Sequence, residues 1–462
     1  MNDAKGPSRL WEKGLPLDAA MHRLSVGDDP ELDKRLLSFD ALGSAAHARM
    51  LAHAGLIALK DAQVLVDALA KIALHARLGE LGIDPAQEDC HTAIEQLLTQ
   101  QLGDAGKRIH LGRSRNDQVI LALRLYMREA LLSIAKQTAQ LADAFIQFAH
   151  AHADESLPGY THLRRAMPSS FGLWAGAFAA GLGEELQAMQ AVYARLDRCP
   201  LGAAAGFGVP LPLDREYLAG LLGFSGVQIS PADVMNSRGR HELALVNGMA
   251  SIGLVLEKFL WDVALYSMPE FGYLELPEAF TTGSSIMPQK RNPDVVELAR
   301  ARCRELRGHV AMLQELAGGL PSNYHRDFQL LKKPLFEALD TAHALLATLV
   351  QLVPGLKVNA ERARAACGDE LYAAHEATRL AQQGVPFRDA YQRVAQQLQD
   401  GTFKPDRQAL KSIHIGGLDN LGLGSIAEEC KHAERWISAT RSRIEKCEKD
   451  IWHKKIGGEW HD

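Results

Sequence analysis

The sequence predicts an all-α protein built around a bundle of long helices, and three observations support this fold class. Ala, Leu, Glu, Gln and Arg, which occur often in helices, are abundant, whereas aromatic residues make up only 6% of the chain. A long segment, from Gln118 to Leu157, contains neither Gly nor Pro. No segment stands out with the apolar and polar alternation that is typical of a half-buried strand. The composition is therefore that of a helical protein.

Length, composition and charge narrow the class further. The chain has 462 residues, enough for about three domains, and its 47% hydrophobic and 23% charged content is that of a soluble globular protein. Its 51 basic and 56 acidic residues give a net charge of −5, so we expect neither a nucleic-acid nor a membrane partner. Six single cysteines without zinc-ligand spacing, and no apolar signal segment at the start, favour a cytoplasmic protein without a metal centre.

Residues 1–111 are expected to form short helices joined by loops. Helical spacing of apolar residues predicts one helix over Gly43–Leu59 and a second over Val64–Leu78, which ends near two glycines. A turn at Ile83-Asp84-Pro85 follows. This part is interpreted as an N-terminal helical domain.

The first long helix is predicted to start at Gln118, with Asn116 or Asp117 as its N-cap. Apolar residues recur along it at helical spacing as far as Phe148. A helix of about 30 residues would be roughly 45 Å long, which exceeds the usual range of globular proteins. We therefore expect it to belong to a long bundle.

Four more long helices are predicted, over residues 168–196, 233–268, 293–316 and 331–353. Pro168 suits the first turn of its helix, while Pro269 and Pro354 mark two helix ends. The uncharged stretch 166–183 is long enough for a membrane span, but its four glycines favour a buried bundle helix. Several of these helices are apolar on too many faces for a single surface helix, which favours an oligomer over a large monomeric core.

Residues 364–462 are expected to return to shorter helices, with a break at Gly384–Arg388 and a charged, solvated helical face from Arg441 to Lys455. The predicted domains are therefore 1–111, a central bundle over 112–363, and 364–462.

Three segments have residue types that suit chemistry rather than helix packing. Gly112–Val119 places two guanidiniums, a hydroxyl and an amide at a helix N-terminus, which is a good site for carboxylate or phosphate, although solvent-facing arginines are an equal alternative. Gly159–Leu163 places a hydroxyl and the imidazole of His162 on a loop, where a histidine is more often structural than catalytic.

The third segment, Thr281–Asp294, separates two long helices and is too irregular to be helical. It holds four hydroxyls, one glycine, two cations and two prolines, which suit an anion-binding functional loop. No phosphate-binding glycine loop, serine-hydrolase elbow or metal-ligand cluster occurs. The residues alone therefore indicate a helical, metal-free site where an imidazole and a hydroxyl move protons on a multiply negative small molecule.

These segments resemble those of a known family. The sequence GSSIMPQKRNPD at 283–294 is similar to the signature loop of the fumarase/aspartase superfamily, and GRSRNDQV at 112–119 with GYTHL at 159–163 points within it to the argininosuccinate lyases. Leu10-Trp11, EDCHTAIE at 88–95, CPLGAAAG at 199–206 and GVPFRDA at 384–390 extend the resemblance over nearly the whole chain. It implies a fumarase/aspartase-like fold.

By that resemblance the protein is a cofactor-free homotetramer, in which five long helices per subunit form a common core and three subunits build each active site. The reaction would be the reversible cleavage of argininosuccinate to arginine and fumarate, the last step of arginine biosynthesis. Ser284 would abstract the proton, with Lys290 and Asn292 near the developing charge. His162, oriented by Glu297, would be its partner, and the sequence leaves open which of the two is acid and which is base.

The resemblance also implies the substrate-binding residues. The carboxylate binders would be Ser114, Arg115 and Asn116, and Thr161 would come from another subunit. Further binders would be Tyr324, Gln329, Lys332, Arg238 and His91. For His91 an alternative is a helical i,i+4 polar pair with Glu95.

The family pattern is not complete. Members usually carry threonine at Leu111, glutamine at Met167, an acidic pair at Leu330-Leu331 and a substrate-holding serine near Asp29. The proton-transfer set is intact, but these changes concern the amino-acid end of the substrate. Two alternatives therefore remain: a lyase of the same fold for another fumarate-releasing substrate, or a non-catalytic structural protein like the crystallins recruited from this family.

Overall fold

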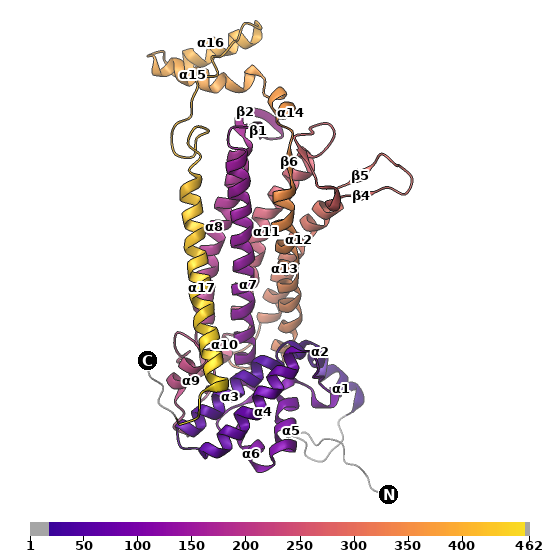
Figure 1. The fold of residues 1–462 in the computed structure, drawn as a ribbon, viewed down its shortest axis with the longest axis vertical. Helices are drawn as coiled ribbons and strands as arrows, with labels where there is room; N and C mark the ends of the chain where they lie inside the picture. Colours follow the sequence, from indigo (N-terminus) through magenta and orange to yellow (C-terminus); the bar gives the residue numbers. More distant parts are fainter. Residues whose placement is uncertain (1–17, 458–462) are drawn as a thin grey trace.

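A computed structural model describes residues 18–457 and shows an elongated helical bundle with smaller groups of helices at its two ends (Figure 1). The helices of the predicted central region are α7 (Arg115–Ala151), α8 (Phe171–Leu196), α11 (Arg240–Tyr266), α12 (Asp294–Ala317) and α13 (Lys332–Gly355). The short helices α9 (Arg215–Leu221) and α10 (Pro231–Asn236) lie between α8 and α11. The five expected long helices are thus present.

The bundle is held together by apolar packing along its length. An aromatic cluster joins α7, α8 and α11, with Phe145 and Phe259 ring centroids 4.8 Å apart and those of Trp174 and Phe178 5.5 Å apart. Gly172 permits a close approach, because a Cβ there would lie 2.7 Å from the Cα of Ala153. The glycines of the uncharged stretch therefore allow close packing inside the protein, as expected.

The N-terminal group comprises six short helices at the lower end of the bundle in Figure 1. They are α1 (Ala19–Val26), α2 (Asp29–Leu32), α3 (Leu37–His53), α4 (Leu59–Arg77), α5 (Cys90–Leu102) and α6 (Asp104–Lys107). The predicted helix over 43–59 is wrong in its bounds. The chain turns after His53, where Gly55 adopts a φ of 70°, and the next helix begins at Leu59.

Three long-helix boundaries also differ from the prediction. Ser114 rather than Asn116 or Asp117 is the N-cap of α7, since its Oγ accepts from the Asn116 N–H while Asp117 accepts from the Ser114 N–H. Gly239, with a φ of 77°, separates α10 from α11 inside the range predicted as one helix. Pro354 lies within α13 and does not end it.

Short antiparallel ribbons occur where the sequence showed no strand pattern. The strands β1 (Ser156–Thr161) and β2 (Arg164–Ser170) form a hairpin, in which Pro168 lies opposite Pro158 instead of starting α8. Two smaller ribbons pair β3 (Leu274–Glu275) with β6 (Lys357–Val358), and β4 (Thr282–Gly283) with β5 (Arg291–Asn292). Each is too short to change the all-α class.

The C-terminal region contains α14 (Ala360–Ala365), α15 (Ala373–Gln382), α16 (Phe387–Gln399) and α17 (Leu423–His453). The first three are short, as predicted, but α17 has 31 residues and runs back along α7 and α8 (Figure 1). The expectation of shorter helices throughout is therefore wrong, because α17 is stabilised along its length by an apolar face that includes Cys430, Ala433 and Ile437.

Two segments, Arg240–Tyr266 and Arg326–Gly355, are long and apolar enough to cross a membrane by length and composition. About half of each apolar window is buried inside the molecule (50% and 56%). Both belong to the central bundle, and the core helices of a bundle have the same length and composition.

Candidate active site

A cavity of about 130 Å³ lies where the N-terminal helices meet the lower end of the bundle. It collects seven of the residues predicted to bind substrate: His91, Arg115, Asn116, Arg238, Tyr324, Gln329 and Lys332. The rest of its lining is Val26, Asp29, Glu88, Asp89, Val119 and Arg326. Segments about 240 positions apart in the chain, from α5 and from the start of α13, thus contribute to one site.

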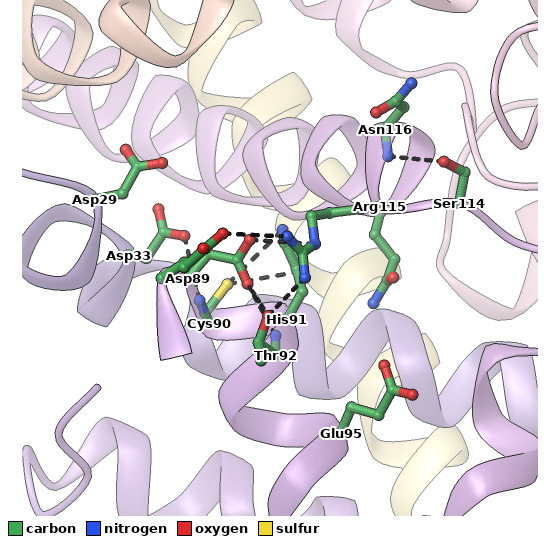
Figure 2. Close-up of polar contacts among 12 residues, drawn as sticks. Asp29, Asp33, Asp89, Cys90, His91, Thr92, Glu95, Ser114, Arg115 and Asn116 are labelled. Atoms are coloured by element: carbon green, nitrogen blue, oxygen red, sulfur yellow. Dashed lines mark hydrogen bonds and ion pairs between the residues drawn. The ribbon is translucent and has the colours of Figure 1, made fainter. Parts of the chain in front are cut away.

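Arg115 and Asn116, at the start of α7, line this cavity, and Figure 2 shows their contacts. Arg115 donates from Nη2 to Thr92 Oγ1 at 2.7 Å, and its Nε lies 3.3 Å from Asp89 Oδ2. The Asn116 side-chain amide makes no hydrogen bond within residues 18–457, while its N–H is held by the Ser114 cap. The helix N-terminus therefore presents a positioned guanidinium and a free amide beside its own positive pole.

Lys332, at the start of α13, also lines the cavity and is almost fully buried. Its Nζ is 2.6 Å from Asp33 Oδ1 and 3.0 Å from Asp29 Oδ2. Burial opposes the charge, but the two carboxylates outweigh it and raise the pKa of Lys332. Burial also raises the pKa of Asp29 to about 6, although the ammonium of Lys332 counteracts it. Asp29 thus supplies a carboxylate that lines the cavity beside this ammonium.

His91 is buried beneath the cavity and is paired with Asp40, since its Nδ1 lies 2.9 Å from Asp40 Oδ2. Burial opposes protonation of the ring, but Asp40 outweighs it and raises the pKa of His91. The alternative pair with Glu95 is wrong, because the Glu95 carboxylate lies instead 3.6 Å from His110 Nδ1.

Asp33, Cys90 and His91 bring three potential metal-ligand atoms within 4.8 Å of one another. These groups are already engaged: Asp33 accepts from Lys332 and from the Cys90 N–H, and His91 is paired with Asp40. A cation would have to compete with the Lys332 ammonium, so the donor set suits an internal ion-pair network better than a metal.

Arg238 is the cavity residue whose hydrogen bonds most directly indicate a bound ligand. Its Nε donates to Glu242 Oε1 and its Nη2 to the Phe328 carbonyl, both at 2.8 Å. Its Nη1 is buried and has no hydrogen-bond partner within the described part of the chain. Since buried donors are nearly always satisfied, this nitrogen indicates a place for a ligand oxygen.

The segment between α12 and α13, which contains Tyr324, Arg326 and Gln329, completes the cavity wall around Arg238. Gln329 donates from Nε2 to the carbonyls of Ser25 and Val26, at 3.0 and 2.9 Å. Its bonds hold the C-terminal end of α1 against the cavity. Tyr324 and Arg326 line the cavity from the same segment.

The remaining predicted residues lie elsewhere. Thr161 and His162 are exposed at the tip of the β1–β2 hairpin, at the upper end of the bundle in Figure 1. His162 and Leu163 both have positive φ values, 53° and 58°, which is the backbone of a tight two-residue hairpin turn. Because α7 has 37 residues and separates the cavity from the hairpin, the two are roughly 55 Å apart at 1.5 Å per residue.

The loop with Ser284 and Lys290 projects from the bundle beyond the β4–β5 ribbon (Figure 1). Ser284 Oγ accepts from the N–H groups of Met287 and Ile286, at 3.2 and 3.4 Å. The base of the loop is fixed by a hydrogen bond from Thr282 Oγ1 to Asp294. Two backbone N–H donors are therefore directed at the oxygen that was predicted to abstract the proton.

Asn292 ends the ribbon in β5, and Glu297 is exposed in the first turn of α12. Within residues 18–457, neither Glu297 nor His162 makes a side-chain hydrogen bond or ion pair, so the predicted pairing of the two is not formed inside one chain. The single chain thus presents three groups of site residues: the cavity, the hairpin tip and the loop.

Several residues that line the cavity or pair with its lining were missed in the sequence. Asp33, Asp40 and Asp89 pair with predicted residues, and Glu88 and Arg326 line the cavity. Glu88 and Asp89 stand inside the EDCHTAIE motif, and Arg326 stands between Tyr324 and Gln329. Their neighbours in the sequence could therefore have identified Glu88, Asp89 and Arg326. Asp33 and Asp40, in contrast, reach the site only through the fold.

Comparison with known proteins identifies similar chains. A family model described as Lyase matches residues 20–308. The chain is 44% identical to an argininosuccinate lyase of Sorangium cellulosum over 92% of this chain and 99% of that protein, and 39% identical to one of Parabacteroides distasonis over 96% and 99%.

Solved structures confirm the predicted fold. An EDDS lyase in complex with formate matches with a TM-score of 0.80 at 20% identity, covering 95% of both chains. A class II fumarase of Schistosoma mansoni matches with a TM-score of 0.69 at 15% identity, covering 84% of this chain and 93% of that one. At these identities the likeness concerns the fold, and it agrees with a fumarase-like all-α bundle.

Proposed function

The chain belongs to the argininosuccinate lyase family of the fumarase/aspartase superfamily, and on that premise we propose that it cleaves argininosuccinate reversibly into L-arginine and fumarate. We further propose that this is the last step of arginine biosynthesis and takes place in the cytoplasm. The relatives favour this activity over a lyase for another substrate and over a crystallin-like structural role.

The cavity beside α7 is the observation that carries the proposal. Arg115, Arg238 and Lys332 supply positive charge, and Asp29 and Asp89 supply negative charge, around one small volume. Such a mixed lining suits a ligand end that carries both an ammonium and a carboxylate. The arginine end of argininosuccinate has this character, and the buried Nη1 of Arg238 is available to its carboxylate.

The bond-breaking step requires removal of a weakly acidic C–H proton next to a carboxylate. In our proposal the Ser284 oxygen takes this proton, the electron pair forms the C=C bond of fumarate, and the C–N bond breaks. His162 gives a proton to the departing guanidino nitrogen. Serine is a weak base, so the two N–H donors to Ser284 Oγ and the cation of Lys290 support its anionic form.

The separation of the three groups of residues supports a shared active site. The cavity and the hairpin tip are roughly 55 Å apart within one chain, which excludes a common site in a monomer. We propose a homotetramer in which the cavity of one subunit receives His162 and Ser284 from two others. Helices α11 and α12 supply exposed apolar residues for such a core: Leu254, Trp261, Leu298 and Met312.

Charged substitutions on this face are expected to break the assembly. Leu254 and Trp261 lie two turns apart on α11 and are half exposed, so both glutamates of Leu254→Glu/Trp261→Glu would be buried in a tetramer core. Native mass spectrometry should show the wild type at four times the 50.5 kDa chain mass and the variant at lower mass, without fumarate release.

Leu74→Glu is the matched control, because Leu74 is 56% exposed on α4, outside the bundle. It should remain tetrameric and active. A tetrameric and active Leu254→Glu/Trp261→Glu variant would contradict the proposed core.

Arg238→Lys tests the binding role of the cavity. Lysine keeps the positive charge but loses the Nη1 donor, so KM should rise about 10- to 100-fold, the equivalent of about 1.5–3 kcal/mol for a charged hydrogen bond. The effect on kcat should be smaller, because this end of the substrate is distant from the breaking bond. Steady-state kinetics measure both, with Arg393→Lys, at an exposed position of α16, as control. An unchanged KM in a folded tetramer would remove Arg238 from the binding set.

The activity itself is tested by fumarate release from argininosuccinate, with arginine identified as the second product. Turnover by the purified chain would establish the reaction. A folded tetramer without turnover on argininosuccinate, but with turnover on another succinyl adduct, would instead assign the chain to a different substrate and identify Asp29 as the first residue to examine.

A further inference from the structure

A second polar cavity, of about 320 Å³, lies at the start of α11 and shares no residue with the substrate cavity. Its lining comes from the end of α8 and the residues just after it, the segment before α10, α10 itself, and the first turn of α11. The lining residues are Arg195, Arg198, Gln228, Asp233, Arg240 and His241. With three arginines and one aspartate, this lining is predominantly positive.

The single carboxylate does not balance these cations. Asp233 Oδ1 accepts from Arg240 Nη2 at 2.9 Å, and its Oδ2 accepts from Gln228 Nε2 at 2.8 Å. The guanidiniums of Arg195 and Arg198 make no hydrogen bond or ion pair within residues 18–457. Two cations at the cavity therefore lack a counter-charge.

A buried arginine behind the cavity adds further positive charge. Arg124 is 1% exposed and donates only to neutral oxygens: the Arg198 carbonyl at 2.9 Å, Gln228 Oε1 at 3.3 Å and Ser237 Oγ at 3.5 Å. Within residues 18–457 no carboxylate forms an ion pair with it. Its charge can therefore stabilise an anion that binds in the cavity beside Gln228.

His241 provides an independent indication of a ligand. It is 7% exposed, and its Nδ1 is buried without any hydrogen-bond partner in the part of the chain that is described. Burial, together with the guanidiniums of Arg124 and Arg240, lowers the pKa of His241 to about 3, so the ring is neutral and can donate one N–H. It is also the second residue of the 27-residue helix α11, whose N-terminus is positive.

We propose that this cavity binds a small anion through a diphosphate group, held by Arg195, Arg198 and Arg240 and by the N–H of His241. Guanidinium forks match phosphate oxygens, and the excess of two cations matches an anion with more than one charge. The cavity volume exceeds that of a single phosphate. The proposal concerns binding alone and does not rest on the lyase activity.

Calorimetric titration of the full-length tetramer with pyrophosphate, at an ionic strength kept constant with sodium chloride, tests this site. We expect saturable binding of one pyrophosphate per chain and an affinity at least tenfold lower in Arg195→Gln/Arg198→Gln. Both arginines are exposed, so this variant should fold normally. Arg388→Gln/Arg393→Gln, which removes two exposed and unpaired arginines of α16, is the matched control and should bind like the wild type.

Two further measurements establish where the pyrophosphate binds. Excess arginine and fumarate should not displace pyrophosphate. Pyrophosphate should shift the NMR signal of the His241 imidazole, which is assigned as the signal that is absent from the His241→Gln variant. Displacement by arginine and fumarate would place the anion in the substrate cavity and overturn the proposal. It would also be overturned by absence of saturable binding, by equal affinity in Arg195→Gln/Arg198→Gln, or by tighter binding of citrate than of pyrophosphate.

Discussion

Replacing Ser284 with alanine should abolish fumarate release while leaving the fold and the assembly intact. The side chain lies on a projecting loop, and its only hydrogen bonds within the described residues come from the N–H groups of Ile286 and Met287. Its loss therefore removes no packing. If Ser284 moves the substrate proton, kcat should fall by on the order of 10²–10⁴-fold or to the detection limit.

Ser285→Ala is the matched control, since Ser285 is the exposed neighbour on the same loop and has no partner there within residues 18–457. It should keep most of the wild-type kcat. Circular dichroism and native mass spectrometry check helix content and assembly for both variants. Near wild-type turnover of Ser284→Ala would remove the loop serine from the proton transfer and leave His162 as the principal candidate.

The long helices could be predicted because their signal is local. Freedom from Gly and Pro and a 3.6-residue apolar period placed α7 close to its observed bounds, and the glycines and prolines at the ends of the segments placed α12 and α13. The same reasoning failed at Pro168, where a proline typical of a first helical turn lies in a strand opposite Pro158. The hairpin is stabilised by that pairing across the chain, which no local pattern expresses.

The substrate cavity also combines residues that a local motif identifies with residues that only the fold brings together. Residues that the resemblance identified, such as Arg115, Asn116 and Gln329, line one cavity in the structure. The carboxylates that control the charge of that cavity were not identified in the sequence. Asp33 and Lys332 are 299 positions apart, and their contact exists only because the loop before α3 meets the start of α13. Charge networks of this kind depend on the fold, so they follow from the structure rather than from a motif.

Mixing two inactive variants should restore activity if the active site is shared. A tetramer of His162→Asn chains lacks the imidazole in every site, and a tetramer of Ser284→Ala chains lacks the hydroxyl in every site. After mild denaturation and reassembly together, some sites receive Ser284 from a His162→Asn chain and His162 from a Ser284→Ala chain. Random mixing of equal amounts would make about a quarter of the sites complete, if the two residues come from different subunits.

The matched control mixes Ser284→Ala with the double variant His162→Asn/Ser284→Ala. No site in that mixture can contain Ser284, so it should stay inactive after the same treatment. Subunit exchange is monitored with mass-tagged chains. Exchange without recovery of activity would mean that His162 and Ser284 act from one chain, which would require the loop beyond the β4–β5 ribbon to close on its own hairpin instead of projecting from the bundle as in Figure 1. Recovery would instead explain why a single chain keeps these two residues away from the cavity that holds the other binding groups: assembly brings them together, so catalysis depends on the tetramer.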